Sequence, residues 1–364
     1  MLLSQLRLAG VSPFDDLTLS FADQPGGMPR RLTVLYGGDG VGKTSILSAI
    51  ASTRPGHTVA QTQGQRDALP SGAAVLSGRM SPSSPFVVAD WILGDDDEGR
   101  PHPLRIVSPN AKLEEAEETS QLRRREQTLF DRRATEGGFV LVAFSGARWF
   151  SRTPVLLTTP ERTLWRHDVR TSATFDDATR ADLARETKQV LTGISIAAAL
   201  SARGGKGSAR RFEAMEHAMR EVLAAFLDQL GFQYLGVDPI RIEPIFATGD
   251  GRQVTFDDLP RGSRHLISFG ALVIRALAAA YPERDLRRTE GVVLLDDIEA
   301  QQELHLQRQV VAMLLRALPR VQWIVTTSSP AVAQGCDASE LFALRRMPES
   351  GRVELHDGAA AVMH

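Results

Sequence analysis

A glycine-rich loop between a buried strand and a helix constrains this chain more than any other segment. The loop, Gly37-Gly38-Asp39-Gly40-Val41-Gly42-Lys43-Thr44, fits the pattern G-x-x-x-x-G-K-[ST] in full. An apolar, β-branched run at 31–36 precedes it, and residues with a helical pattern follow at 46–51. Glycine-rich backbone can turn tightly enough for several N–H groups to converge on a phosphate, and the helix N-terminus adds its positive dipole end. The alternative, a glycine-rich turn with an incidental lysine, leaves this strand–loop–helix context unexplained.

The side chains at the end of the loop predict a nucleotide bound with a metal. Lys43 is expected to reach the β- and γ-phosphates of ATP, and Thr44 to hold Mg²⁺ through its hydroxyl. A second carboxylate is needed at the end of a neighbouring strand, and the apolar run 291–295 ends in Asp296 and Asp297. An acidic pair can also simply end a strand at the surface. Beside a phosphate loop, however, the two motifs explain each other.

Length and charge bound the class of protein. The 364 residues allow one large domain, or a core domain with a substantial insertion. The net charge of -2 means that any nucleic-acid contact has to come from a local patch. One cysteine, Cys336, excludes an internal disulfide and fits a reducing compartment. No stretch approaches the roughly 18 apolar residues of a membrane span, and the first residues do not resemble a signal peptide, so we expect a cytoplasmic protein with no membrane contact.

Hydrophobic periodicity predicts alternating strands and helices along most of the chain. A Gly-, Ser- and Pro-rich stretch at 53–85 is predicted as a loop. The expected strands lie at 2–8, 17–21, 31–36, 86–93, 104–107, 139–144, 240–247, 291–295 and 321–326, with one or two more at the end. The expected helices lie at 111–134, 176–191, 209–230, 265–280 and 305–318.

Four motifs in a fixed order carry a family resemblance. After the phosphate loop come LPRGSR at 259–264 before a long apolar helix, LLDDIE at 294–299 and IVTTSSP at 324–330. This order resembles ABC-type ATPase heads, particularly their SMC-like, RecF-like and OLD-like branch, and the resemblance covers nearly the whole chain. It implies an α/β P-loop NTPase fold with an ABC-ATPase-like core sheet, an antiparallel β subdomain and a helical insertion. The core would comprise 1–94 and 236–364, and 95–235 would be a mainly helical lateral insertion.

The resemblance also assigns roles to individual residues. Gly37, Gly42, Lys43, Thr44 and Ser45 match the family's phosphate loop, and Asp296 matches the aspartate that supports the metal. Leu259 to Arg264, with Gly262 and Arg264 as the expected contacts, match the signature turn that in the family caps the γ-phosphate of the opposite subunit. Asp297 stands where the family usually has the glutamate that activates water, and Ser328 where it often has a histidine. The metal-sensing glutamine has three equal candidates, Gln61, Gln63 and Gln65.

Three positions depart from the family pattern, and all three affect catalysis. Asp297 is one C–C bond, about 1.5 Å, shorter than glutamate, and a general base has to lie within hydrogen-bond reach of the water. Pro260 replaces a serine hydroxyl in the signature turn, and Ser328 supplies no imidazole. We therefore expect a slow ATPase that acts as a nucleotide-dependent switch. The alternatives are a catalytically degenerate ATP-binding scaffold and a RecF-like DNA-binding protein.

The family resemblance also implies partners. Members of this branch act as dimers in DNA repair, chromosome maintenance and defence against phage. The chain is accordingly expected to pair with itself or with a related head around two ATP molecules, and to control an effector protein. Because it carries no nuclease motif and no long coiled-coil arm, the effector would be a separate subunit.

Several basic residues leave alternatives open. Arg148 follows a strand, so it could contact a phosphate, be exposed or be paired within the structure. Arg261 and Arg264 could supply charge across a dimer interface, or form a solvated loop pair. Two basic clusters, within 123–133 and 203–211, could contact a nucleic-acid backbone. The acidic neighbours of the first cluster favour a solvated, salt-bridged helix face instead, and the second cluster, in a flexible loop, has the same two alternatives.

Overall fold

The computed structural model describes residues 1–24, 26–56, 86–108, 113, 115–134, 136–169, 175, 181–201, 206–358 and 361, with the backbone alone for 206–209. Gln61, Gln63 and Gln65, the three candidates for the metal-sensing position, lie outside these residues. So does most of the loop predicted for 53–85.

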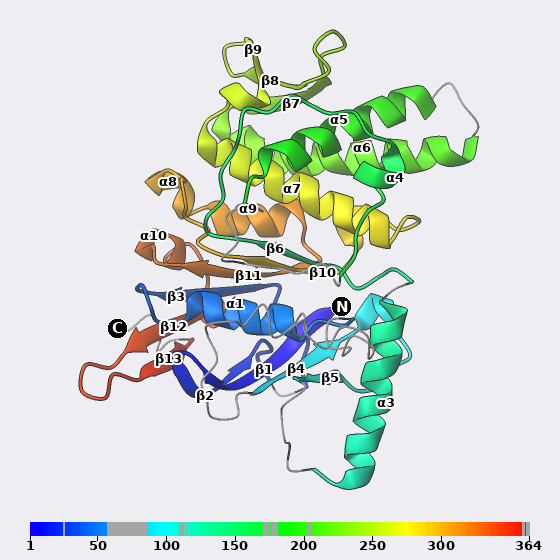
Figure 1. The fold of residues 1–364 in the computed structure, drawn as a ribbon. Coiled ribbons are helices and arrows are strands. Elements are labelled where there is room, and N and C mark those ends of the chain that lie inside the picture. The colour runs from blue at the N-terminus through cyan, green and yellow to red at the C-terminus, as the bar shows by residue number, and fades with distance from the viewer. Residues whose placement is uncertain are drawn as a thin grey trace.

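A six-stranded sheet forms the centre of the molecule (Figure 1). In spatial order its strands are β13 (Val353–Asp357), β12 (Leu341–Arg346), β3 (Leu32–Gly37), β11 (Val321–Thr327), β10 (Gly291–Leu295) and β6 (Leu141–Phe144). All neighbouring strands run parallel except β13, which is antiparallel to β12. The carboxyl ends of β3, β10 and β11 therefore meet at one edge of the sheet.

The side chains of the central strands divide between two hydrophobic cores. On β10, Val292 and Leu294 belong to one core and Val293 and Leu295 to the other. Successive residues of a strand point to opposite faces, so a strand covered on both faces is apolar throughout. All five residues of β10 are buried. This double burial explains why its sequence lacks the alternation of a half-exposed strand.

One face of the central sheet is covered by α1 (Lys43–Ser52) and by a second sheet beyond it (Figure 1). The second sheet is antiparallel, with the order β2 (Phe14–Ser20), β1 (Leu2–Val11), β4 (Phe86–Ile92) and β5 (Leu104–Val107). Apolar side chains of both sheets and of α1, such as Ile46 and Ile50, form one core. Helix α1 is thus held from both sides, which fixes the direction in which its N-terminus points.

Helix α3 (Glu117–Arg133) lies beside β5 and carries the first of the two basic clusters. Arg123 pairs with Glu115 at 2.6 Å, and Arg133 lies 3.4 Å from Asp97. These pairs support the salt-bridged alternative for this part of the helix.

The opposite face of the central sheet is covered by helices (Figure 1). They are α5 (Ala184–Ser201), α6 (Lys206–Leu227), α7 (Arg261–Ala280) and α9 (Val310–Ala317), with the short helices α4 (Pro160–Thr163), α8 (Leu304–Gln307) and α10 (Pro330–Ala333) at their margins. A three-stranded antiparallel sheet, β7 (Phe232–Val237), β8 (Pro244–Thr248) and β9 (Gln253–Thr255), lies beyond them. Of the helices described, α7 is long and apolar enough to cross a membrane, but 78% of that window is buried, as in a core helix.

The segment 95–235 is not a separate helical insertion. Its strand β5 pairs with β4 in the antiparallel sheet, and its strand β6 pairs with β10 at the edge of the central sheet. The predicted boundaries at 95 and 235 therefore cut across both sheets. A short apolar run predicts that a strand exists but not which strand it pairs with, because pairing is set by contacts far apart in the sequence.

Smaller differences concern the ends of elements. Asp15 and Asp16 belong to β2, so the turn between β1 and β2 is shorter than predicted. The helix expected at 305–318 is two helices, α8 and α9, and β7 and β9 lie where no strand was expected.

Candidate nucleotide-binding site

The predicted phosphate loop connects β3 to α1 at the carboxyl edge of the central sheet. Strand β3 ends at Gly37, and α1 begins at Lys43. Between them Gly38, Asp39 and Gly40 are exposed, whereas Val41 is buried. A Cβ added at Gly38 or Gly40 would meet no atom within 4 Å. The outer side of the loop is therefore open, which leaves room for a phosphate chain above it.

Glycine is required at two positions of the loop. Gly42 caps α1 with φ 91, a left-handed conformation that side chains rarely adopt. A Cβ there would also lie 2.4 Å from Cδ of Pro13. At Gly37 a Cβ would lie 2.5 Å from the carbonyl oxygen of Leu344. The turn at Pro13 and strand β12 thus pack closely against the loop at the start of α1.

The Lys43 side chain folds back over the loop. Its Nζ donates to the carbonyl oxygens of Gly37 at 2.8 Å and Gly38 at 2.9 Å, and the residue is 7% exposed. Arg346 of β12 donates from Nη2 to the Gly40 carbonyl at 2.8 Å. Thr44 and Ser45 follow on the first turn of α1, with Thr44 partly exposed and Ser45 buried. The ammonium and the helix N-terminus are thus placed at the same opening, as a bound phosphate requires.

Asp296 joins this loop to the strands beside it. The Thr44 hydroxyl lies 3.0 Å from Oδ2 of Asp296, and the Thr326 hydroxyl donates to Oδ1 at 2.6 Å. Asp296 is 4% exposed, and its burial raises the pKa of the carboxyl above the usual aspartate value, although both hydroxyls and Arg148 act to lower it. A hydroxyl and a carboxylate in contact are hard oxygen donors, which suit Mg²⁺ when its remaining ligands are water and phosphate.

Thr44 and Asp296 are two oxygen donors in direct contact at this opening. Within the described residues, no group of three or more His, Cys, Asp or Glu side chains could hold a metal ion without other ligands.

Asp297 lies at the same edge, with an unusual backbone conformation. Its φ is 46, in the left-handed region, and its amide donates to the Thr326 hydroxyl at 2.8 Å. Its Oδ2 would lie 2.5 Å from a Cβ added at Gly146, so this glycine admits the carboxylate. Burial, followed by the charges of Asp296 and Glu299, raises the pKa of Asp297 to about 6.

Arg148 is paired within the structure. Its guanidinium donates to the carbonyl oxygens of Ser145 at 2.7 Å and Asp297 at 2.8 Å, and also to that of Asp296. The residue is 3% exposed, and burial lowers the pKa of its guanidinium to about 10. Of the three possibilities for Arg148, structural pairing is confirmed. It links β6 to the end of β10 and so holds both aspartates in place.

Ser328 contacts an acidic residue that sequence reasoning had not singled out. Both its amide and its hydroxyl donate to Oε1 of Glu299 at 2.7 Å. The Oε2 atom of Glu299 is buried and has no hydrogen-bond partner among the described residues. The sequence signal for Glu299 is its place as the third acidic residue of LLDDIE, two positions after Asp297. The site thus holds a glutamate in addition to its two aspartates.

The predicted signature turn forms the N-terminus of α7, with Pro260 as its first residue outside the helix. Gly262 is buried beneath Gln302, whose Nε2 donates to the Gly262 carbonyl at 3.2 Å. No hydrogen bond or ion pair among the described residues joins this turn to the phosphate loop of the same chain.

A basic pocket of about 370 Å³ lies beside this turn. Arg152, Arg261 and Arg264 line it together with Trp149, which is 46% exposed. Burial lowers the pKa of Arg264, and its Nε is buried without a partner in the part of the chain described. Asp257 is the one carboxylate of this lining and is paired with Lys188 at 2.6 Å, so the three guanidinium groups leave an excess of positive charge that suits an anion.

The fold is shared with structures of known proteins. No protein-family model matches the chain. A structure described as the SmcHead bound to the C-winged helix domain of ScpA is 14% identical, with 100% of both chains covered and a TM-score of 0.53. A Smc head domain with an extended coiled coil, bound to the C-terminal domain of ScpA derived from Pyrococcus furiosus, is 13% identical, with 99% of this chain and 98% of that chain covered and a TM-score of 0.51. At these identities the likeness establishes the fold alone: the chain has the P-loop ATPase fold of SMC head domains.

The environment of Asp297 predicts a pH-dependent effect on stability. The pKa of Asp297 rises from 3.8 to about 6 on folding, so the folded protein binds the proton more tightly than the unfolded chain does. The stability that this proton contributes is lost as the pH rises through about 6. Asp297→Asn should therefore raise the free energy of unfolding at pH 8 by about 1 kcal/mol, a value reduced for the partial exposure of the carboxylate. Urea unfolding at pH 8 and at pH 4.5 measures the difference, which should shrink at the lower pH. An equal effect at both pH values would contradict the assigned shift.

Proposed function

We propose that this chain is an ATP-binding head of the ABC ATPase class that hydrolyses ATP slowly. The observation that supports the proposal is the contact between Thr44 and Asp296, because a hydroxyl and a carboxylate, two oxygen donors that suit Mg²⁺, lie together beside the opening of the phosphate loop. Lys43 at the same opening supplies the charge for the β- and γ-phosphates. In this proposal ATP binds along 37–45, and Mg²⁺ is held by Thr44 and, through water, by Asp296.

Two such heads would enclose two ATP molecules. No hydrogen bond or ion pair among the described residues joins the signature turn to the phosphate loop of its own chain, and the one carboxylate lining its arginine pocket, that of Asp257, is already paired with Lys188 at 2.6 Å. In a head-to-head dimer, Arg264 and Arg261 would contact the γ-phosphate held by the other subunit and replace the hydroxyl that Pro260 lacks. Gly262 would contribute through the backbone at the start of α7, because Gln302 already covers its Cα.

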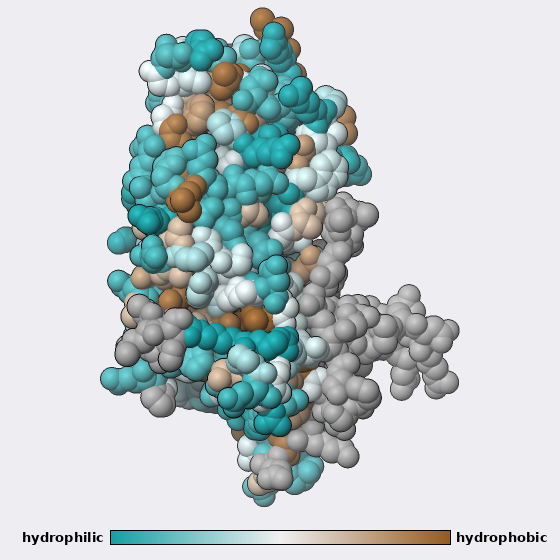
Figure 2. All heavy atoms as spheres, turned by 90° about the vertical axis from the view of Figure 1, so that its left-hand side faces the viewer, coloured by the Kyte–Doolittle hydropathy of each residue, from teal (hydrophilic) through white to brown (hydrophobic). Residues whose placement is uncertain are grey.

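The surface at this edge favours a dimer that depends on nucleotide. Helices α8 and α10, which follow β10 and β11, lie on the left-hand side of Figure 1. Figure 2 faces this side and shows mainly hydrophilic residues with scattered apolar ones. Stable permanent dimers bury more hydrophobic surfaces. We therefore infer that phosphate charge, and not apolar area, holds the two heads together.

Slow turnover follows from the residues around the expected γ-phosphate. Asp297 is the proposed general base, and its short side chain has to reach the attacking water. Ser328 supplies a hydroxyl already bound to Glu299 where an imidazole would otherwise stand. A protein of this kind spends most of its cycle in the ATP-bound state, which suits a switch better than a motor.

A switch requires something to control, and we propose a separate effector protein. The SMC heads with this fold are described in complex with domains of ScpA, so a head of this shape can bind a second protein. A place in the RecF-like or OLD-like branch, and a role in DNA repair or in defence against phage in the cytoplasm, belong to the same proposal. They rest on the order of the four motifs.

The dimer is tested with Arg261→Glu and Arg264→Glu in one chain. At the proposed interface the two carboxylates would face the γ-phosphate, so the ATPγS-dependent dimer should weaken at least about tenfold. Arg124→Glu with Arg125→Glu is the matched control, because both arginines are exposed on α3 and the change in net charge is the same. Mass photometry across a protein dilution series gives the dimer affinity. If the control weakens the dimer as much as Arg261→Glu with Arg264→Glu does, or if the dimer forms without nucleotide, this arrangement is refuted.

The catalytic assignment is tested by ATP turnover. We expect a rate below about 1 s⁻¹ for the isolated protein, at the low end for enzymes, and an increase of at least about threefold for Asp297→Glu. Glu299→Gln retains an acceptor for Ser328 and should change the rate by less than about threefold. If Glu299→Gln abolishes turnover while Asp297→Glu has no effect, Glu299 is the base. Binding without any turnover would instead identify an ATP-binding scaffold.

A further inference from the structure

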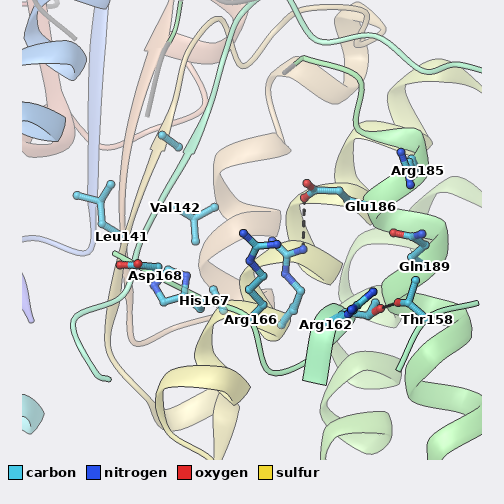
Figure 3. A pocket seen from close by; sticks show the side chains of 14 residues that line it. Leu141, Val142, Thr158, Arg162, Arg166, His167, Asp168, Arg185, Glu186 and Gln189 are labelled. Atoms are coloured by element: carbon cyan, nitrogen blue, oxygen red, sulfur yellow. Dashed lines mark hydrogen bonds and ion pairs between the residues drawn. The ribbon is translucent and has the colours of Figure 1, made fainter. Parts of the chain in front are cut away.

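A second cavity lies away from the phosphate loop, beside the edge strand of the central sheet. Its volume is about 620 Å³, within the range of pockets that bind small molecules. Its walls come from β6, from the segment that includes α4, from α5 and from α7. Leu141, Val142 and Ala143 of β6 lie along one side, as Figure 3 shows for the first two. This side is apolar, and the remaining walls are mostly polar.

Four arginines surround this cavity. Arg162 and Arg166 belong to the segment of α4, Arg185 to α5 and Arg275 to α7. Figure 3 shows Arg166 near the centre of the view, Arg162 beside Thr158, and Arg185 on the helix that also carries Glu186 and Gln189. Guanidinium groups repel one another, and the positive charge gathered here from three elements attracts an anion. An anion in the cavity would remove this repulsion.

The protein's own carboxylates supply little of this charge. Glu186 lies 3.3 Å from Arg275 and is 57% exposed, and Asp168 is the other acidic residue of the wall. In the part of the chain that the structure describes, the guanidinium groups of Arg162, Arg166 and Arg185 make no ion pair. Arg123 on α3, in contrast, is paired with Glu115 at 2.6 Å. These three positive charges are available to a ligand.

Two further groups in the wall lack partners. The Nε of Arg275 and the Nε2 of His167 are both buried and have no hydrogen-bond partner among the described residues. Burial, and then the positive charge of Arg275, lower the pKa of His167 to about 4, so its imidazole is neutral at physiological pH. Buried polar atoms are normally hydrogen-bonded. An occupant with acceptor oxygens would satisfy the Arg275 atom and neutralise the arginines.

The geometry points to a binding site for a small phosphorylated molecule in this cavity. Arginine binds phosphate through two parallel hydrogen bonds, which lysine does not provide. A nucleic-acid backbone presents its phosphates in a row along an extended surface. Here the arginines instead surround one cavity with an apolar side, which suits a molecule with one phosphorylated end. The site is separate from the proposed ATP site, and its existence does not depend on that proposal.

The experiment uses inorganic pyrophosphate as the probe and calorimetry as the readout. All titrations are made in a background that carries Lys43→Ala, Arg261→Glu and Arg264→Glu, so that neither the phosphate loop nor the arginine pocket beside the signature turn contributes. We expect saturable binding at one site, weakened at least about tenfold by Arg166→Glu with Arg185→Glu, because two donors become repulsive carboxylates. Thermal unfolding checks that each variant is folded, which is expected because both arginines are exposed.

The matched control reverses two other exposed arginines, Arg124→Glu with Arg125→Glu on α3. It makes the same change in net charge and should leave pyrophosphate affinity within about twofold, because charges farther away than a Debye length are screened. No saturable binding of pyrophosphate, or an equal loss in both double variants, would overturn the proposal. A second result would also overturn it: the protein binds a 20-base-pair DNA duplex but not pyrophosphate, and Arg166→Glu with Arg185→Glu abolishes the DNA binding.

Discussion

The site depends on one buried carboxylate, that of Asp296, held by two hydroxyls. Thr44 on α1 and Thr326 at the end of β11 both contact this carboxylate, which follows β10. Its hydrogen bonds therefore join three elements of the fold. Burial alone would favour the protonated form, as the raised pKa shows. The hydroxyls and the nearby Lys43 and Arg148 act in the opposite direction. A divalent cation at this place would stabilise the ionised form further, which links metal binding to the geometry of the loop.

The two faces of the central sheet explain why this geometry is fixed. Helix α1 is packed between two sheets, and Gly37 and Gly42 let β12 and the first turn approach the loop closely. On the other side Arg148 holds the carbonyl groups of Asp296 and Asp297 from β6. The loop and the aspartates are thus supported by rigid elements, as a preorganised site requires.

The phosphate loop and its partner Asp296 could be predicted from the sequence because each is a local pattern, and parallel strands bring their carboxyl ends to one edge. The pairing of β6 with β10, the role of Arg148 and the contact between Ser328 and Glu299 could not. Each joins residues brought together only by the topology of the sheet. The arginine cavity was missed for the same reason, since Arg166, Arg185 and Arg275 lie far apart along the chain.

The central claim is that the loop binds ATP with magnesium, and calorimetric titration of the purified protein with MgATP tests it most directly. We expect one saturable site per chain, an affinity at least about tenfold lower in Lys43→Ala because a charged phosphate contact is lost, and weaker binding when magnesium is removed. If the folded protein, alone and with the proteins that co-purify with it, shows no affinity for ATP, the account is wrong.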